Sequence, residues 1–232
     1  MTSRAQRREV TQRAILDASL KLLADGGQEA LTVRGLAREL NLVPSALYRY
    51  VTNRADLLNI LFEHVYNDYA DTVQAAHDAV AREDVRGRWR AVAFAQREWG
   101  LEHPHEWTLI NGTPPRDYSA LVNQPIPAAS RVHVMLALLG ADVEAAGYRP
   151  RVQAEDYGTN LDGLREFAAT TGANVQPETL VAGVAAWHMI TGVLRVEFFR
   201  AYAYDIVAPA DYFALIVAGS EKLLFGDGPV NA

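Results

Sequence analysis

The sequence predicts an all-α protein built from two helical domains. Apolar residues recur at steps of three and four through most of the 232 residues, as they do on one face of a helix. Proline and glycine interrupt these segments at intervals typical of helix boundaries. No segment shows the sustained alternation of a half-buried strand.

The first predicted helix carries an apolar stripe over Val10–Leu23 and ends at Gly26 and Gly27. Thr32 follows, and its hydroxyl can accept a hydrogen bond from the first turn of a helix over Val33–Leu40. We therefore expect a second short helix that begins directly after Thr32.

A tight turn and a third helix come next. Asn41 tolerates the left-handed backbone conformation better than most residues, and Pro44 suits the first turn of a helix. Leu47 and Val51 lie four residues apart and can both point inward. Two helices joined by a turn of about three to four residues match a helix-turn-helix motif.

The third helix leaves polar and aromatic side chains outward, an arrangement that fits the major groove of DNA. Arg49 and Ser45, with Pro44 and Arg34, are the expected base readers, because an arginine side chain matches a guanine edge. The start of a capped helix also binds anions. The expected phosphate contacts are Thr32, Tyr48, Tyr50 and Arg54. For Tyr50 the alternative is packing against the first helix.

Many residues of this region match, in order, the sequence pattern of a known protein family. They are Ile15-Leu16-Asp17-Ala18, Leu22-Leu23, Gly26-Gly27, Leu31-Thr32-Val33, Leu36-Ala37, Leu47-Tyr48-Arg49-Tyr50-Val51 and Arg54-Ala55-Asp56-Leu57-Leu58. Residues 4–65 as a block resemble the DNA-binding domain of TetR family transcriptional regulators. The resemblance also implies the phosphate contacts of Tyr48, Tyr50 and Arg54. Two positions depart from the family pattern: Asn41 stands where the turn usually has glycine, and Val43 replaces a capping residue, at a cost of roughly 1 kcal/mol.

The charges are divided unevenly along the chain. Residues 1–62 hold nine Lys or Arg and six Asp or Glu, which gives them a net charge of +3. The whole chain has a net charge of −6, so the remaining residues carry a net charge of −9. A basic N-terminal region can hold phosphates locally although the whole protein is acidic. Four arginines near the start are candidates for an arm on DNA, the alternative being a solvated terminus: Arg4, Arg7, Arg8 and Arg13.

Composition excludes several classes of function. The chain has no Cys, so disulfides, thiolate metal sites and a cysteine nucleophile are absent. His103, His105 and Glu106 lack the helical spacing and the fourth ligand of a metal site, and no catalytic motif is found. We expect no metal, no cofactor and no catalytic residue. With no apolar signal region and no apolar run near about 20 residues, we expect a cytoplasmic protein without a membrane partner.

The rest of the chain predicts further helices, which give domains over 1–53 and 54–226 and a flexible tail over 227–232. Asn53-Arg54-Ala55-Asp56 resembles a capping box that opens a long linking helix. The later helices are expected over 85–102, through Trp107, Leu109 and Ile110 to a stop at Asn111-Gly112, and over 126–146, 159–171, 177–200 and 209–225. A proline-rich connection is expected over 113–127.

The last two predicted helices are apolar on two sides, which predicts that each buries one face outside its own domain. Two such helices from each subunit would form an isologous four-helix interface. The residues expected in this homodimer interface are Val181, Ala185, Met189, Gly192, Val196, Phe213, Ile216 and Leu224. The alternative is a fully buried core helix in a monomer.

A second resemblance concerns the C-terminal part of the chain. Trp187-His188 followed by Gly192, with His103-Pro104-His105-Glu106-Trp107 upstream, resembles the WHG-type C-terminal domain of some TetR-like regulators over about residues 80–200. It implies a dimerisation and ligand domain. The residues expected around a cavity for a hydrophobic effector are Phe94, Trp99, Trp107, Tyr118, Met135 and His188, each of which could instead belong to the core.

Three functions are compatible with this pattern. The leading one is a homodimeric repressor that binds a palindromic double-stranded operator and is released by an unknown, small hydrophobic effector. The second is a regulator of the same fold without a small-molecule effector. The third is a helical enzyme or carrier domain with a vestigial DNA module.

Overall fold

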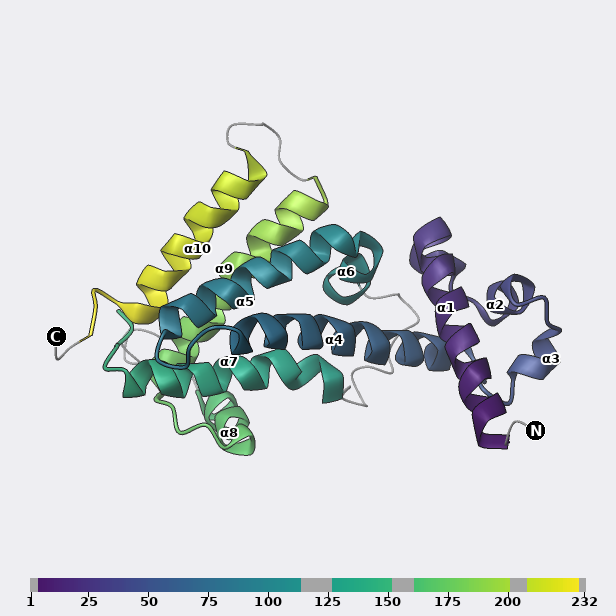
Figure 1. The fold of residues 1–232 in the computed structure, drawn as a ribbon, viewed down its shortest axis with the longest axis horizontal. Coiled ribbons are helices and arrows are strands. Elements are labelled where there is room, and N and C mark those ends of the chain that lie inside the picture. The colour runs from purple at the N-terminus through teal and green to yellow at the C-terminus, as the bar shows by residue number, and fades with distance from the viewer. Residues whose placement is uncertain (1–3, 114–126, 152–160, 201–207, 230–232) are drawn as a thin grey trace. The chain divides into compact units, whose positions relative to one another are not determined.

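The fold is all-α, as predicted. The computed structural model describes residues 4–113, 127–151, 161–200 and 208–229, and over these residues it contains ten α-helices and no strand (Figure 1). The first five helices are α1 (Arg4–Ala30), α2 (Val33–Glu39), α3 (Pro44–Leu47), α4 (Arg54–Asp78) and α5 (Val85–Glu102). The others are α6 (Pro104–Asn111), α7 (Pro127–Ala145), α8 (Asp162–Thr171), α9 (Pro177–Phe198) and α10 (Pro209–Phe225).

The chain divides into two compact units. The first comprises Met1–Asp68 and Glu102–Ala129, and the second comprises Tyr69–Leu101 and Ser130–Ala232. This division differs from the expected boundary after residue 53. The first four turns of α4 belong to the first unit because Leu57, Leu58 and Leu61 are buried there, and α6 packs against α1. Of the expected tail, residues 230–232 lie outside the described residues.

The first unit has a compact apolar core. Its most buried side chains come from α1, α2, α3 and α4, and they include Ile15, Leu23, Leu36, Leu47 and Leu57. The backbone of α1 breaks its helical geometry at Gly27, which has φ of 64° and ψ of −164°, a conformation that glycine adopts readily. The predicted glycine stop therefore appears as a kink, after which one more turn leads to α2.

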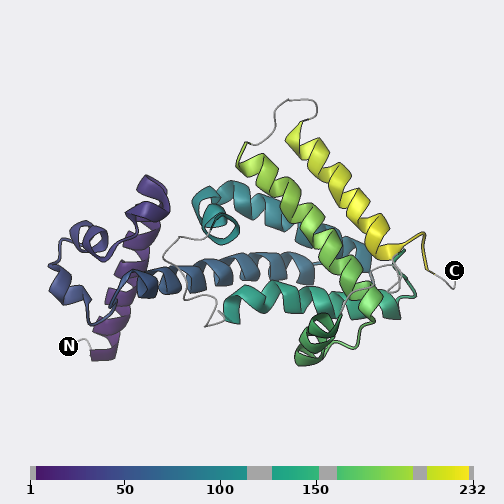
Figure 2. The same ribbon diagram turned by 180° about the vertical axis from the view of Figure 1, so that it is seen from behind.

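The second unit is held together by α5, α9 and α10. Helices α9 and α10 lie side by side, as both views show (Figures 1 and 2). The indole Nε1 of buried Trp89 on α5 donates a 2.9 Å hydrogen bond to Oγ of Ser220 on α10. Ion pairs join the same helix to its neighbours, Arg90 to Glu221 and Arg97 to Glu197.

Helix α9 corrects the expectation that no apolar run approaches membrane-spanning length. Among the described helices, α9 is long and apolar enough to cross a membrane by length and composition alone, with a mean hydropathy of 1.4. The core helix of a soluble protein passes the same test. Ile190 and Leu194 are fully buried and α9 packs along α10, so in this fold one side of α9 belongs to the protein core.

Candidate nucleic-acid interface and ligand cavity

The start of α2 has the geometry predicted from its sequence. Thr32 has extended φ and ψ of −132° and 152°, and its Oγ1 accepts a 2.9 Å hydrogen bond from the backbone N–H of Gly35. A Cβ at position 35 would lie 2.8 Å from the carbonyl oxygen of Ala30 and 3.0 Å from Thr32 Oγ1. Glycine thus lets the capped turn approach the end of α1 closely.

The turn between α2 and α3 is also as predicted. Asn41 has a φ of 53°, in the left-handed region, and the backbone N–H of Leu42 donates to the carbonyl of Ala37 at 2.8 Å. Pro44 occupies the first turn of α3, and Val43 before it makes no side-chain capping bond. Helix α3 therefore lacks a side-chain cap at its start, as expected for valine at position 43.

Helix α3 is anchored by two buried residues and exposes its remaining surface. Leu47 and Val51 have no exposed surface, and the N–H of Val51 donates to the carbonyl of Leu47 at 2.9 Å. Tyr48 ends the helix and is 53% exposed. Regular helical geometry is therefore confined to Pro44–Leu47, shorter than the recognition helix that the sequence suggested.

The predicted DNA-contacting residues differ in exposure. Arg49 is exposed, with its guanidinium carbon 4.9 Å from the ring centroid of half-buried Tyr50. This cation–π contact orients both side chains within one surface. Thr32 is half-buried, whereas the remaining base-reading candidates, Arg34, Pro44 and Ser45, are exposed.

Arg54 is placed differently from the expectation. Its Nε donates to the carbonyl oxygen of Leu31 at 2.9 Å and its Nη2 to that of Gln28 at 2.8 Å, and the side chain is half-buried. A guanidinium committed to these oxygens ties the end of α1 to the start of α4. These bonds favour a positioning role over the expected phosphate contact, and the sequence could not reveal them because carbonyl partners leave no signature in it.

The capping box at the start of α4 does form. Oδ1 of Asn53 accepts from the N–H of Asp56 at 2.9 Å, and Oδ2 of Asp56 accepts from the N–H of Thr52 at 3.0 Å. Two backbone donors that have no helical partner are thereby satisfied.

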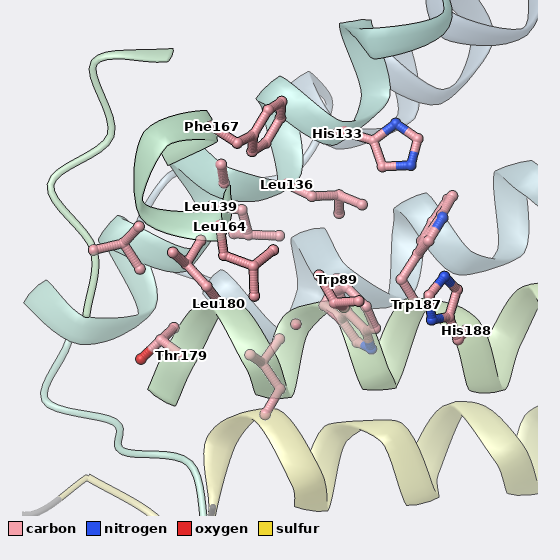
Figure 3. Close-up of a pocket in the computed structure, with 16 residues that line it drawn as sticks. Trp89, His133, Leu136, Leu139, Leu164, Phe167, Thr179, Leu180, Trp187 and His188 are labelled. Atoms are coloured by element: carbon pink, nitrogen blue, oxygen red, sulfur yellow. The ribbon is translucent and has the colours of Figure 1, made fainter. Parts of the chain in front are cut away.

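The second unit contains a small apolar cavity, shown in Figure 3, with a volume of about 90 Å³. Leucines and aromatic rings from α5, α7, α8 and α9 line most of it. His133 and His188 lie at one end beside Trp187, whereas Thr179 lies at the other (Figure 3). The rings of His133 and Trp187 meet edge-on, with centroids 6.3 Å apart.

Among the expected cavity residues that the structure describes, His188 alone lines this cavity. Met135 lines a different, larger cavity of the same unit. Trp107 is fully buried on α6 in the first unit, and Tyr118 lies outside the described residues. The expected set therefore does not form one site.

Phe94 and Trp99 line neither of these two cavities and are corrected to packing residues. Phe94 meets Phe213 edge-on at 5.4 Å between centroids, and buried Trp99 lies 5.0 Å from the ring of Tyr69. Sequence reasoning missed the cavity-lining His133, because a histidine on a predicted helix carries no sign of which way it faces.

The expected dimerisation residues fall into two groups. Phe213 and Leu224 are buried within their own unit, Phe213 against Phe94 and Leu224 in the wall of the 90 Å³ cavity, so they cannot contribute to a subunit surface. Leu215, absent from the expected set, is 64% exposed on α10. The expected residues that are exposed or half-buried are Val181, Ala185, Met189, Gly192, Val196 and Ile216.

Two family models match this chain. Residues 15–61 match the bacterial regulatory proteins of the tetR family, and residues 89–219 match the tetracyclin repressor-like C-terminal domain. The chain belongs to the TetR family. It is therefore a transcriptional regulator with a helix-turn-helix DNA-binding domain, and such regulators are not enzymes.

Relatives of this TetR regulator agree in sequence and in fold. It is 28% identical over 207 residues to the HTH-type transcriptional regulator Rv1816 of Mycobacterium tuberculosis, an alignment covering 88% of this chain and 87% of that protein. The crystal structure of SCO4313, named as a regulatory protein, has a TM-score of 0.72 and 26% identity, covering 94% of this chain and 98% of that one. BioQ of Mycobacterium smegmatis is similar in fold, with a TM-score of 0.55, 21% identity and coverage of 94% and 99%.

Proposed function

We propose that this TetR regulator is a cytoplasmic repressor that binds a specific, two-fold symmetric operator as a homodimer and leaves it when a small hydrophobic ligand binds. The observation that carries the proposal is the surface of α3 and the residues after it. Ser45, Tyr48 and Arg49 are exposed there, on a segment held in place by buried Leu47 and Val51.

The side chains of this surface take different parts. Arg49 and Ser45 read base edges, with Pro44 and Arg34 beside them, because sequence is read by hydrogen bonds and apolar contacts in the groove. Phosphates are held by Thr32 with the first amides of α2 and by Tyr48 and Tyr50. Arg54 acts through its backbone contacts by positioning α1 and α4.

The outer face of α9 supports the homodimer. Val181, Ala185, Met189 and Val196 are apolar and exposed or half-buried on one side of a helix whose other side is core. Leu215 and half-buried Ile216 extend apolar surface onto α10. A second copy related by two-fold symmetry would bury this surface and present two reading heads to a palindromic operator.

The cavity of about 90 Å³ supports a ligand response. It is smaller than the roughly 300 Å³ at which ligand pockets begin, so an effector must widen it. A ligand that binds the wider state more tightly shifts the population toward that state. Because α4 is shared by both units, a shift of this helix on ligand binding would alter the half-site spacing and weaken operator binding.

The experiment for DNA binding uses a duplex recovered by selection from a random pool. Fluorescence anisotropy with the full chain should show two chains per symmetric duplex and at least about tenfold weaker binding to one half-site, since both reading heads contribute. Met189→Glu and Leu215→Glu should give monomers by analytical ultracentrifugation. Equal affinity for one and two half-sites would contradict the dimeric proposal.

The experiment for the ligand uses toluene and phenol as probes matched to a small apolar cavity. Gly183 lines the cavity, and a Cβ there meets no atom within 4 Å, so Gly183→Leu should fill the space. Gly163→Leu is the matched control. Gly163 is also a helical glycine whose added Cβ would meet no atom within 4 Å, but it does not line the cavity. Probe-induced loss of operator binding should disappear in Gly183→Leu alone. If saturating toluene and phenol both leave the operator affinity of the wild type unchanged, these compounds do not release the protein from DNA, which would contradict the proposal for them.

A further inference from the structure

A second, larger cavity in the C-terminal unit is distinct from the site proposed for the effector. Its volume is about 760 Å³, within the range of about 300–1,000 Å³ for small-molecule sites. Met135, Leu138 and Leu139 of α7 form an apolar side. Most of the polar lining comes from the end of α4, from Arg82, from Arg88 on α5 and from Asp142 on α7.

Arg88 is the unusual member of this lining. Its side chain is only 5% exposed, and its Nη1 donates to Oδ2 of Asp142 at 2.9 Å and lies 3.3 Å from Nε2 of His77. Its Nε and Nη2 are buried and have no hydrogen-bond partner among the described residues. A buried charged group with two unsatisfied donors is costly, which makes this edge of the guanidinium a site for an acceptor.

Two other arginines on the same helix show what this edge binds. Arg90 uses Nε and Nη2 to hold the two carboxylate oxygens of Glu221. Arg97 uses the same two nitrogens for Glu197, at 3.0 and 2.6 Å. Arg88 presents the same pair of donors, and within the described part of the chain no carboxylate meets them. Parallel N–H donors of this kind match a carboxylate in shape as well as charge.

The charged groups that line the cavity are balanced. Arg82 Nη2 pairs with Oδ1 of Asp142 at 2.9 Å, so Asp142 is shared between two arginines. Burial acts to raise the pKa of Asp142, but hydrogen bonds from Arg88 and Arg82 outweigh it and lower the pKa. Asp78 also faces the cavity, bonded to Gln74 and His77. Because these lining residues carry no net excess of positive charge, selectivity must come from the donor geometry and the apolar side.

We propose that this cavity binds a small organic acid, with its carboxylate on Nε and Nη2 of Arg88 and its hydrocarbon part on Met135, Leu138 and Leu139. Both nitrogens are covered in the structure, so the ligand must displace neighbouring side chains to reach them. Arg82 and Leu138 are 80% and 45% exposed and can move at little cost. This site goes beyond the proposed effector cavity and does not depend on it.

The test is calorimetric titration of the full chain with octanoate and with octanamide, which share a chain and differ in charge. Octanoate should bind at least about tenfold more tightly, because it accepts two charge-assisted hydrogen bonds. Arg88→Lys keeps the charge but loses the paired donors, and should weaken octanoate by about tenfold or more. Arg90→Lys, on the same helix but outside the cavity, should leave octanoate binding unchanged.

Two further variants locate octanoate in one cavity or the other. Leu138→Asp places a negative charge on an exposed wall of the larger cavity, so it should weaken octanoate without unfolding the protein, even if Arg88→Lys fails to fold. Gly183→Leu fills the smaller cavity and should leave octanoate binding intact. Equal binding of octanoate and octanamide, unchanged binding in folded Arg88→Lys or in Leu138→Asp, or loss of binding in Gly183→Leu would each overturn the proposal.

Discussion

Arginine side chains serve different purposes in the two units of this protein. In the N-terminal unit Arg34 and Arg49 of the helix-turn-helix region are both exposed. In the C-terminal unit Arg88 and Arg97 form ion pairs with Asp142 and Glu197, with side chains only 5% and 17% exposed. Exposure, rather than residue type, therefore separates the arginines that are available to a polyanion from those that hold helices together.

The largest expected effect is on the buried pairs. Glu197→Ala leaves Arg97 partly buried without its carboxylate and should lower the free energy of unfolding by about 3 kcal/mol. Asp71→Ala is the control, because its pair with Arg131 is exposed and should contribute under about 0.5 kcal/mol. Urea denaturation measures both. Equal losses would mean that burial does not distinguish the two classes of pair.

The next effect is on the exposed arginine of the first unit. Arg49→Ala should reduce discrimination between the operator and a duplex altered at one base by about 1–3 kcal/mol. Its free energy of unfolding should change by less than about 0.5 kcal/mol. Anisotropy titrations on the two duplexes measure the first quantity. Arg165→Ala, an exposed arginine on α8, is the control and should leave discrimination unchanged. Unchanged discrimination in Arg49→Ala would remove that residue from base reading.

Arg54 combines both situations, because it lies in the N-terminal unit yet its side chain is bonded within the protein. Arg54→Ala should lower the free energy of unfolding by about 2 kcal/mol, since two hydrogen bonds from a charged donor are lost. The dependence of operator affinity on salt concentration should stay the same. A slope of log affinity against log salt that is shallower by about one would instead show that Arg54 contacts a phosphate.

The smallest expected effect is a pH dependence in the C-terminal unit. The pKa of Asp142 in the folded protein is lowered below its ordinary value of 3.8. The ionised carboxylate therefore stabilises the fold at pH values above the pKa of the unfolded state, and this stabilisation is lost as pH falls through the pKa of the folded state. Wild type should therefore lose stability between about pH 5 and values below about 4. Asp142→Asn should lose less over this range in urea denaturation. An identical pH profile in the variant would show that Asp142 is not the group responsible.

Local chemistry made much of the fold predictable. The expected bounds of α5 and α10 match the structure: Pro104 follows the end of α5, and Pro209 and Gly226 mark the two ends of α10. The Thr32 cap, the left-handed Asn41 and the capping box before α4 each depend on residues within four positions of one another. Interactions of this range can be read along the chain.

The candidate sites were harder to predict because their partners are distant. Asp142 lies 54 residues from Arg88, and Arg54 bonds carbonyl groups 26 and 23 residues away. Periodicity also showed two apolar faces on α10 without indicating which one faces inward, so Phe213 and Leu224 were assigned to the wrong face. Only the packed structure distinguishes such faces.

The proposed function requires that the surface around Arg49 reads a specific, two-fold symmetric sequence. Selection of bound duplexes from a random pool, with the full chain at physiological salt, tests it most directly. We expect enrichment of two inverted half-sites whose centres lie about one helical turn, or a multiple of it, apart. A recovered pool with no enrichment over the input would contradict it.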